Sequence, residues 1–106
     1  MDRPKVKGDM LAALDQASEF LKALSGRSRL GILCHLLDGE KSVGELVSLT
    51  GSRDTAVSQQ LGLLRREGIV AARRDGQTIY YTIANEGAAR VLETLHSVFC
   101  DKGVIR

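Results

Sequence analysis

The sequence predicts a mainly α-helical domain with a β-hairpin, in the order of four helices, two strands and a last helix. The first observation is that apolar residues recur at helical spacing in five separate stretches. The second is the run of residues 69–83, which has β-rich arms on either side of Asp75-Gly76, a dipeptide typical of hairpin turns. The third is the length of 106 residues, which suits one domain with one core.

The composition is that of a globular protein. Apolar residues make up 43% and charged residues 26% of the chain, while aromatic residues are only 4%, so the core has to be built from Leu, Val, Ile and Ala. The chain contains no run of about 20 apolar residues, the length needed to span a bilayer. Its charged start also lacks the apolar stretch of a signal peptide. We therefore expect a cytoplasmic protein with no membrane partner.

The chain begins with an expected flexible tail, residues 1–8, which holds the only proline and three basic residues. From Asp9, the expected N-cap, apolar residues follow helical spacing as far as Leu24, where Ser25-Gly26 interrupts the pattern. A second helix then runs to about Gly39. Its apolar positions at i, i+3, i+4 and i+7 are Leu30, Leu33, Cys34 and Leu37.

Ser42 and Glu45 have the spacing of a capping box, which predicts the start of a short third helix. A turn over residues 51–54 separates it from a fourth helix that begins at Thr55. Two short helices joined by a tight glycine-containing turn form a helix-turn-helix, although a generic helical hairpin would show the same pattern. The third helix is expected to bury Val43, Leu46, Val47 and Leu49.

The hairpin favours the helix-turn-helix over the generic helical hairpin. It follows the fourth helix at once, and its turn is flanked by an arginine pair and by Gln77. A helix-turn-helix followed directly by a hairpin with a polar, basic tip is the winged helix-turn-helix arrangement. The last helix extends from about Glu86 to Cys100, so residues 9–100 are expected to form one DNA-binding and dimerisation domain, with 101–106 as a C-terminal tail.

The fourth helix has two different faces. At about 100° per residue, Val57, Leu61 and Leu64 form one apolar stripe. The opposite face lacks carboxylates and carries uncharged hydrogen-bonding side chains that can contact base edges in a DNA major groove, glutamine being suited to adenine. The candidate base-contacting residues are Thr55, Ser58 and Gln59, and Gly62 and Arg66 lie on the same side.

Basic residues are concentrated around this helix. Residues 53–74 contain five arginines against Asp54 and Glu67, a net charge of +3, whereas the whole chain carries only +2. A local basic surface of this kind suits a polyanion, although a solvated basic face is the alternative. The candidate contacts to the DNA backbone are Arg53, Arg65, Arg66, Arg73, Arg74 and Gln77.

Four segments resemble the ArsR/SmtB family of bacterial winged-helix repressors: LKALSGRSRLGIL (residues 21–33), VGEL (43–46), TAVSQQLGLLRREGIV (55–70) and RRDGQTIYYTI (73–83). The resemblance implies a homodimer whose first and last helices form the interface. It also implies binding to an inverted repeat in double-stranded operator DNA, with half-sites about one helical turn apart, and release by a chemical inducer.

The chain departs from the metal-sensing members of that family. Arsenic sensors carry a CxC pair in the third helix, where this chain has ELVSLT (residues 45–50). Nickel, cobalt and zinc sensors place Asp and His ligands along the last helix, which here offers only Glu86, Glu93 and His96. Neither metal site is expected, and no cofactor is expected.

The two cysteines, Cys34 and Cys100, resemble those of the sulfide-responsive BigR/SqrR branch, whose members become bridged by reactive sulfur species. The resemblance implies that a persulfide or polysulfide is the inducer. In that chemistry one thiolate takes up sulfane sulfur and the second closes a disulfide or longer bridge. His35 and His96 are the residues nearest in sequence to the two cysteines that could help a thiolate to form. Cys34 is the preferred nucleophile.

Three other functions have sequence arguments of their own. Cys34 and Cys100, with His35 or His96, could bind a thiophilic metal such as zinc, cadmium or lead in a metal-responsive repressor. A thiol enzyme would also use cysteines, but the chain has no CxxC motif or cofactor loop, so no enzymatic activity is expected. An interaction module with degenerate DNA contacts would show no salt-sensitive binding to any duplex.

Overall fold

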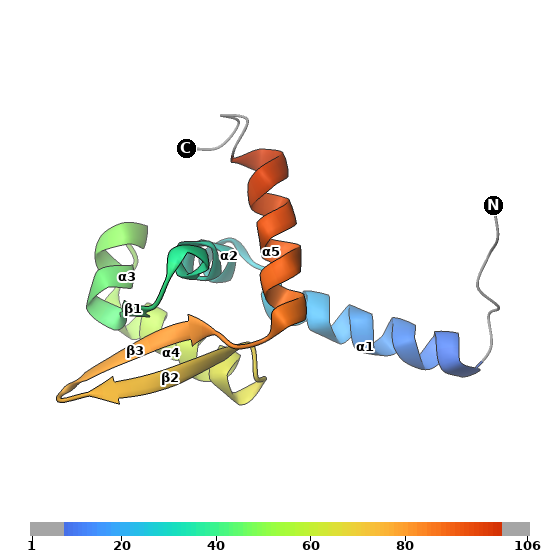
Figure 1. The fold of residues 1–106 in the computed structure, drawn as a ribbon, viewed down its shortest axis with the longest axis horizontal. Coiled ribbons are helices and arrows are strands. Elements are labelled where there is room, and N and C mark those ends of the chain that lie inside the picture. Colours follow the sequence, from blue (N-terminus) through green and yellow to red (C-terminus); the bar gives the residue numbers. More distant parts are fainter. Residues whose placement is uncertain (1–7, 101–106) are drawn as a thin grey trace.

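The computed structural model describes residues 8–100, and the expected flexible tails lie outside them apart from Gly8. The predicted order of helices and strands is confirmed, with two short elements added (Figure 1). The elements are α1 (Gly8–Leu24), α2 (Arg27–His35), the 3-10 turn η1 (Leu36–Asp38), β1 (Lys41–Ser42), α3 (Val43–Thr50), α4 (Asp54–Arg66), β2 (Val70–Asp75), β3 (Thr78–Ile83) and α5 (Glu86–Phe99).

The three strands form one antiparallel sheet in the order β1-β3-β2. The predicted hairpin joins β2 to β3, with Asp75 opposite Thr78, and Gly76 supplies the positive φ of +66° that the turn requires. The added strand β1 pairs Lys41 with Tyr81 and Ser42 with Tyr80. It fixes the middle of β3 to the chain that enters α3, while the tip of the hairpin extends away from the helices (Figure 1).

The turn between α3 and α4 is built as the sequence predicts, with one shift. The Ser42 hydroxyl accepts a hydrogen bond from the Glu45 backbone N–H, and the Glu45 carboxylate accepts one from the Ser42 N–H, which completes the capping box. Gly51 ends α3 in the left-handed conformation, φ +74°. Asp54, predicted in the turn, is already the first residue of α4.

The core lies where the helices meet the base of the sheet. α3 contributes Leu46, fully buried, and the partly buried Val43 and Val47. The expectation that Leu49 is buried is wrong, because its side chain is 49% exposed. At about 100° per residue, Leu49 lies roughly 110° from the middle of the stripe formed by the other three, so it turns away from the core.

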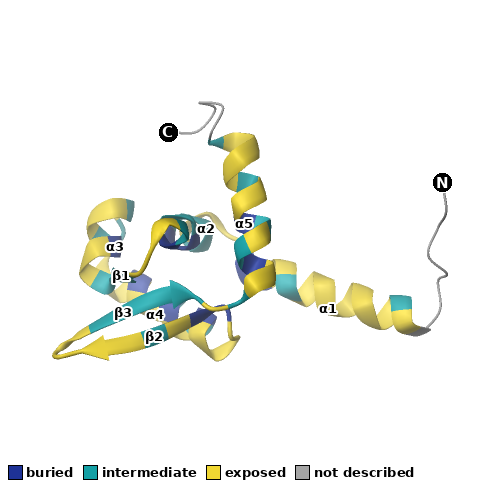
Figure 2. Ribbon diagram, viewed as in Figure 1, coloured by how far each residue is buried: buried dark blue, intermediate teal, exposed yellow. Residues whose placement is uncertain are grey.

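Helix α1 extends away from the rest of the molecule, as Figures 1 and 2 show. Its last turn is anchored by the buried Ala23 and Leu24, whereas Leu11, Leu14 and Leu21 are each more than half exposed. The sequence predicts this helix from the spacing of those leucines, yet within one chain they have little to pack against. Among the described residues no helix is both long and apolar enough to cross a membrane.

Candidate functional site

Helix α4 separates its apolar and polar side chains cleanly. Val57, Leu61 and Leu64 have no exposed surface and lie in the core, as the sequence predicts. Thr55, Ser58 and Gln59 are all exposed on the outer side of the same helix. The structure therefore brings the three candidate base-contacting residues together on one solvent-facing surface.

One carboxylate borders this surface. Asp54 occupies the first turn of α4, and the Ser58 hydroxyl donates a 3.4 Å hydrogen bond to its Oδ1. Its negative charge is favourable there because the positive end of the helix dipole lies at the N-terminus. Sequence reasoning missed the contact because it placed Asp54 in the turn, although the i, i+4 spacing to Ser58 is the signal that would have revealed it.

The two adjacent glutamines of α4 have different environments. Gln60 accepts a 2.7 Å hydrogen bond from Arg29 Nε, and the same guanidinium donates to the Ala23 carbonyl oxygen at 2.9 Å. Arg29 thereby links α2, the end of α1 and α4. Gln59 is exposed and makes no such link, so of the two side chains it is Gln59 that is available to a ligand.

The residues predicted to contact the DNA backbone lie at both ends of α4 and on the hairpin. Arg53 directly precedes the helix and Arg65 and Arg66 occupy its last turn, all three exposed. Along an α-helix of this length the two ends are separated by roughly 18 Å. Arg74 and Gln77 are exposed near the hairpin turn. The three arginines place positive charge at both ends of α4, and Arg74 and Gln77 place hydrogen-bond donors near the tip of the hairpin.

Arg73 differs from the other candidate backbone contacts because it is already bound within the chain. Its guanidinium donates two hydrogen bonds to the Glu40 carboxylate, from Nε at 3.1 Å and from an Nη atom at 2.5 Å. These bonds hold the pKa of Glu40 below its usual range and raise the pKa of Arg73. Sequence reasoning missed Glu40 because 33 residues separate the pair.

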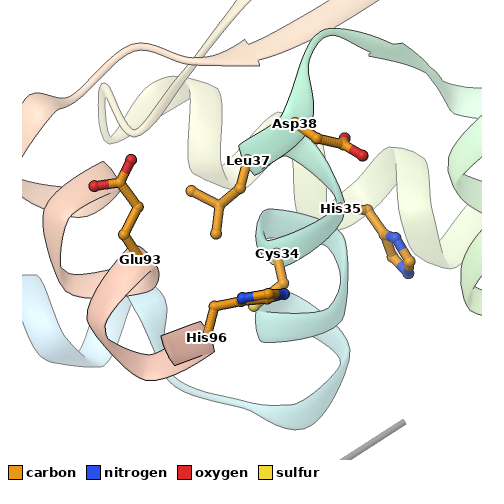
Figure 3. A pocket seen from close by; sticks show the side chains of 6 residues that line it. All are labelled: Cys34, His35, Leu37, Asp38, Glu93 and His96. Carbon is orange, nitrogen blue, oxygen red and sulfur yellow. The ribbon is translucent and has the colours of Figure 1, made fainter. Parts of the chain in front are cut away.

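Cys34 lies on α2, and Cys100 directly follows α5, the helix that packs against α2. Cys34 is partly buried against the core, and Cys100 caps the C-terminal end of α5. Both are free thiols. A pocket of about 430 Å³ adjoins this region, and its lining residues are Cys34, His35, Leu37, Asp38, Glu93 and His96 (Figure 3).

Burial raises the pKa of the Cys34 thiol, and the nearby Cys100 thiolate raises it further. Cys100 acts on Cys34 electrostatically because α2 packs against α5, although 66 positions separate the two residues in sequence. The raised pKa counts against Cys34 as the preferred nucleophile, because less thiolate is present at neutral pH. In Figure 3 the His96 imidazole extends from α5 toward Cys34, while the His35 side chain extends away from α5.

The part of the chain that the structure describes gives a thiophilic metal no ready set of ligands. Within residues 8–100, no three His, Cys, Asp or Glu side chains are grouped in a way that could hold a metal ion. Of the residues of the metal alternative, Cys34, His35 and His96 line the pocket, and Cys100 is not among its lining residues.

Comparison with known proteins identifies relatives over most of the chain. Residues 26–72 match the family described as "Bacterial regulatory protein, arsR family". The chain is 44% identical over 85 residues to the transcriptional activator HlyU of Vibrio cholerae, covering 80% of this chain and 79% of that protein. It is 40% identical over 92 residues to the biofilm growth-associated repressor of Xylella fastidiosa, covering 87% and 81% of the two chains.

Solved structures share the fold. Reduced HlyU from Vibrio cholerae superposes with a TM-score of 0.85 at 40% identity, covering 89% of this chain and 99% of that chain. The transcriptional repressor BigR from Xylella fastidiosa gives a TM-score of 0.80 at 38% identity, covering 91% and 98%. The homodimeric winged helix-turn-helix domain Mb0332 from Mycobacterium bovis gives 0.73 at 36% identity, covering 91% and 89%.

Proposed function

Because the chain belongs to the ArsR family of bacterial DNA-binding transcriptional regulators, which are not enzymes, we propose that it is a dithiol-sensing repressor. In the cytoplasm it binds double-stranded operator DNA as a homodimer. It leaves the DNA when a persulfide or polysulfide bridges Cys34 and Cys100. The observation that carries this proposal is the placement of Cys34 on α2 and of Cys100 at the end of α5, two helices that pack against each other in an ArsR-type fold.

Binding to DNA uses the outer face of α4. Thr55, Ser58 and Gln59 contact base edges, and an inverted repeat presents the same edges to both protomers. The exposed arginines at the ends of α4, together with Arg74 and Gln77, contact the backbone and set the position of the helix. The resulting affinity falls with salt concentration.

Dimerisation buries the exposed apolar surfaces of α1 and α5. Leu11, Leu14 and Leu21 on α1, and Val98 and Phe99 on α5, are between 45% and 57% exposed in the single chain. Large apolar side chains gathered on two helices favour association, because burying them removes apolar surface from water. The relative from Mycobacterium bovis is homodimeric, which supports association of this chain with a second copy.

The sulfur chemistry balances with the persulfide as the oxidant. A cysteine thiolate attacks the outer sulfur of R–S–SH, RS⁻ leaves, and a cysteine persulfide forms. The second thiolate attacks the cysteine sulfur of that persulfide and expels HS⁻, which leaves a disulfide between Cys34 and Cys100. If both cysteines carry persulfides, their reaction expels H₂S and leaves a trisulfide. Since α2 and α5 carry the two sulfurs, a bridge ties these helices together and displaces the DNA-binding elements.

Intact-mass analysis tests this proposal. After treatment with glutathione persulfide, the expected product is a single chain heavier by whole sulfur atoms less two hydrogens, or lighter by two hydrogens for a plain disulfide. Hydrogen peroxide and diamide add no sulfur, so they distinguish persulfide chemistry from general oxidation. Mass spectra recorded under native conditions also reveal any bound metal. Such a metal would support the alternative, a repressor that binds a thiophilic metal through Cys34 and Cys100.

Serine variants link the bridge to DNA release. Cys34→Ser and Cys100→Ser should each bind operator DNA like the parent and fail to leave it on addition of persulfide. If both single variants still respond to the inducer, the two-thiol mechanism is wrong even though the chain remains a DNA-binding regulator.

A further inference from the structure

The hairpin arginines lie on opposite faces of the sheet. Successive residues of a strand point to opposite sides, so Arg74 shares a face with the buried Val70, while Arg73 is on the other face. Arg73 stands opposite Tyr80 on β3, and its guanidinium lies over that ring at 5.0 Å from the centroid. The two arginines that appear equivalent in sequence therefore have different surroundings.

Glu40 reaches Arg73 across the middle strand. Glu40 directly precedes β1, whose residues Lys41 and Ser42 pair with Tyr81 and Tyr80. Its carboxylate accepts both hydrogen bonds from Arg73, a bidentate arrangement that uses the planar fork of the guanidinium. The Arg73 side chain is 54% and the Glu40 side chain 37% exposed, so water and solutes still have access to the pair.

These contacts cancel the charge of the hairpin. Besides Glu40, the Asp75 carboxylate lies 4.0 Å from an Nη atom of Arg73. Two carboxylates thus stand beside Arg73, and the hairpin that is basic in sequence has no net charge when Glu40 is counted with Arg73, Arg74 and Asp75. Like any exposed carboxylate, Glu40 is ionised at neutral pH, and because Arg73 lowers its pKa it stays ionised to more acidic pH than an ordinary glutamate.

We infer that Glu40 is an internal counter-ion that withholds Arg73 from DNA phosphates and so limits the affinity of the protein for DNA of any sequence. A DNA phosphate group would accept hydrogen bonds from the same two guanidinium N–H groups that Glu40 already engages. To contact DNA, Arg73 must leave Glu40, and the freed carboxylate then repels the phosphates. Lower sequence-independent affinity leaves discrimination to the base-contacting face of α4. This inference requires DNA binding but no thiol chemistry.

Glu40→Gln tests the inference, because glutamine has the same shape without the charge. With a fluorescein-labelled duplex of arbitrary sequence, the variant should bind roughly three- to tenfold more tightly at low salt. The slope of log affinity against log salt should steepen by about 0.9, the value for one added phosphate contact. Glu86→Gln, which removes the same charge from the start of α5, is the matched control and should change neither quantity.

A double variant shows whether Glu40 acts by neutralising the charge of Arg73 or only by stabilising the fold. Glu40→Gln with Arg73→Gln removes the pair as a neutral unit and should bind with the affinity and salt slope of the parent. Arg74→Gln should by contrast flatten the slope. Unchanged or weaker binding by Glu40→Gln, with an unchanged thermal midpoint, overturns the inference. So does a double variant with a shallower slope than the parent, because Arg73 would then already contact phosphate.

Discussion

At the scale of single residues, Gln59 and Gln60 show how neighbouring identical side chains serve different purposes. Gln60 holds Arg29 at 2.7 Å, while Gln59 is exposed beside Ser58. A side chain that is already hydrogen-bonded within the fold is poorly suited to contact DNA, because the contact would cost the existing bond. Position on the helix therefore decides which glutamine can contribute to specificity.

Gln59→Ala should weaken binding to the operator by about 1–3 kcal/mol, the value of a bidentate contact to adenine. The dimer and the thermal midpoint should stay as in the parent protein. Fluorescence anisotropy with operator DNA measures the loss. Gln60→Ala is the control: it should instead lower the free energy of unfolding by about 1 kcal/mol through loss of the Arg29 bond. Full operator affinity in Gln59→Ala would remove this residue from the base-contacting set.

Cys34 should be slow to react with iodoacetamide at neutral pH. Burial raises the pKa of its thiol, so the thiolate forms only as the pH rises past the usual value of about 8.5. The rate of alkylation, followed by peptide mapping, should therefore have its midpoint above that value. In Cys100→Ser the midpoint should fall but stay raised, because burial is the larger cause and the Cys100 charge the smaller. A midpoint below the usual value would contradict the burial of Cys34.

The pattern of residues predicts much of the candidate site, and it fails where contacts are long-range. The polar and apolar faces of α4 follow from helical geometry alone, which is why Val57, Leu61 and Leu64 could be placed in the core. The pairing of Arg73 with Glu40 depends on how three strands are ordered. No local pattern in the sequence contains that information, so the sequence predicts Arg73 as a contact to the DNA backbone and gives no sign of its ion pair with Glu40.

At the scale of elements, α3 shows how a helix of only eight residues is held in place. Its start is closed by the reciprocal hydrogen bonds of Ser42 and Glu45. At its end the Thr50 hydroxyl donates to the Leu46 carbonyl oxygen at 2.7 Å and accepts from the Ser52 N–H. So short a helix gains little from its own cooperativity, which makes these end contacts important.

Ser42→Ala should lower the free energy of unfolding by about 1 kcal/mol, because the N-terminal N–H groups of α3 lose their acceptor. Urea denaturation followed by circular dichroism measures this change. Ser48→Ala, on the exposed side of the same helix, is the matched control and should have a smaller effect. Equal stability of the two variants would show that the capping box contributes nothing measurable.

The elements that the sequence predicts best are those with long periodic patterns. The four longer helices and the hairpin were all located, and α5 ends one residue before its expected end. β1 was missed because two residues cannot show an alternating pattern. Strand pairing creates β1: its residues are extended because Tyr80 and Tyr81 offer backbone partners.

At the scale of the whole molecule, α1 is the feature that a single chain does not explain. Most of its length lies away from the core (Figure 2), and Leu14 is 54% exposed. The leucine spacing predicts a buried stripe, and the structure places that stripe on the outside of the chain. A second copy is the partner proposed to cover it.

Leu14→Glu should shift the protein from dimer to monomer and abolish operator binding, because a charge cannot be buried unpaired in an apolar interface. Analytical ultracentrifugation measures the association. Leu49→Glu is a matched control, since Leu49 is 49% exposed on α3, outside the proposed interface, and its substitution should leave the dimer intact. A dimeric Leu14→Glu would exclude this part of α1 from the contact.

With α1 as the proposed dimer interface, the protein should respond to its own abundance. If two copies must join before both α4 helices can contact an operator, the concentration of competent protein grows with the square of the copy number while monomers predominate. Halving the gene dose then removes about three quarters of the active regulator. A helix with three uncovered leucines would thus give a bacterial promoter a threshold in protein number, independent of any inducer.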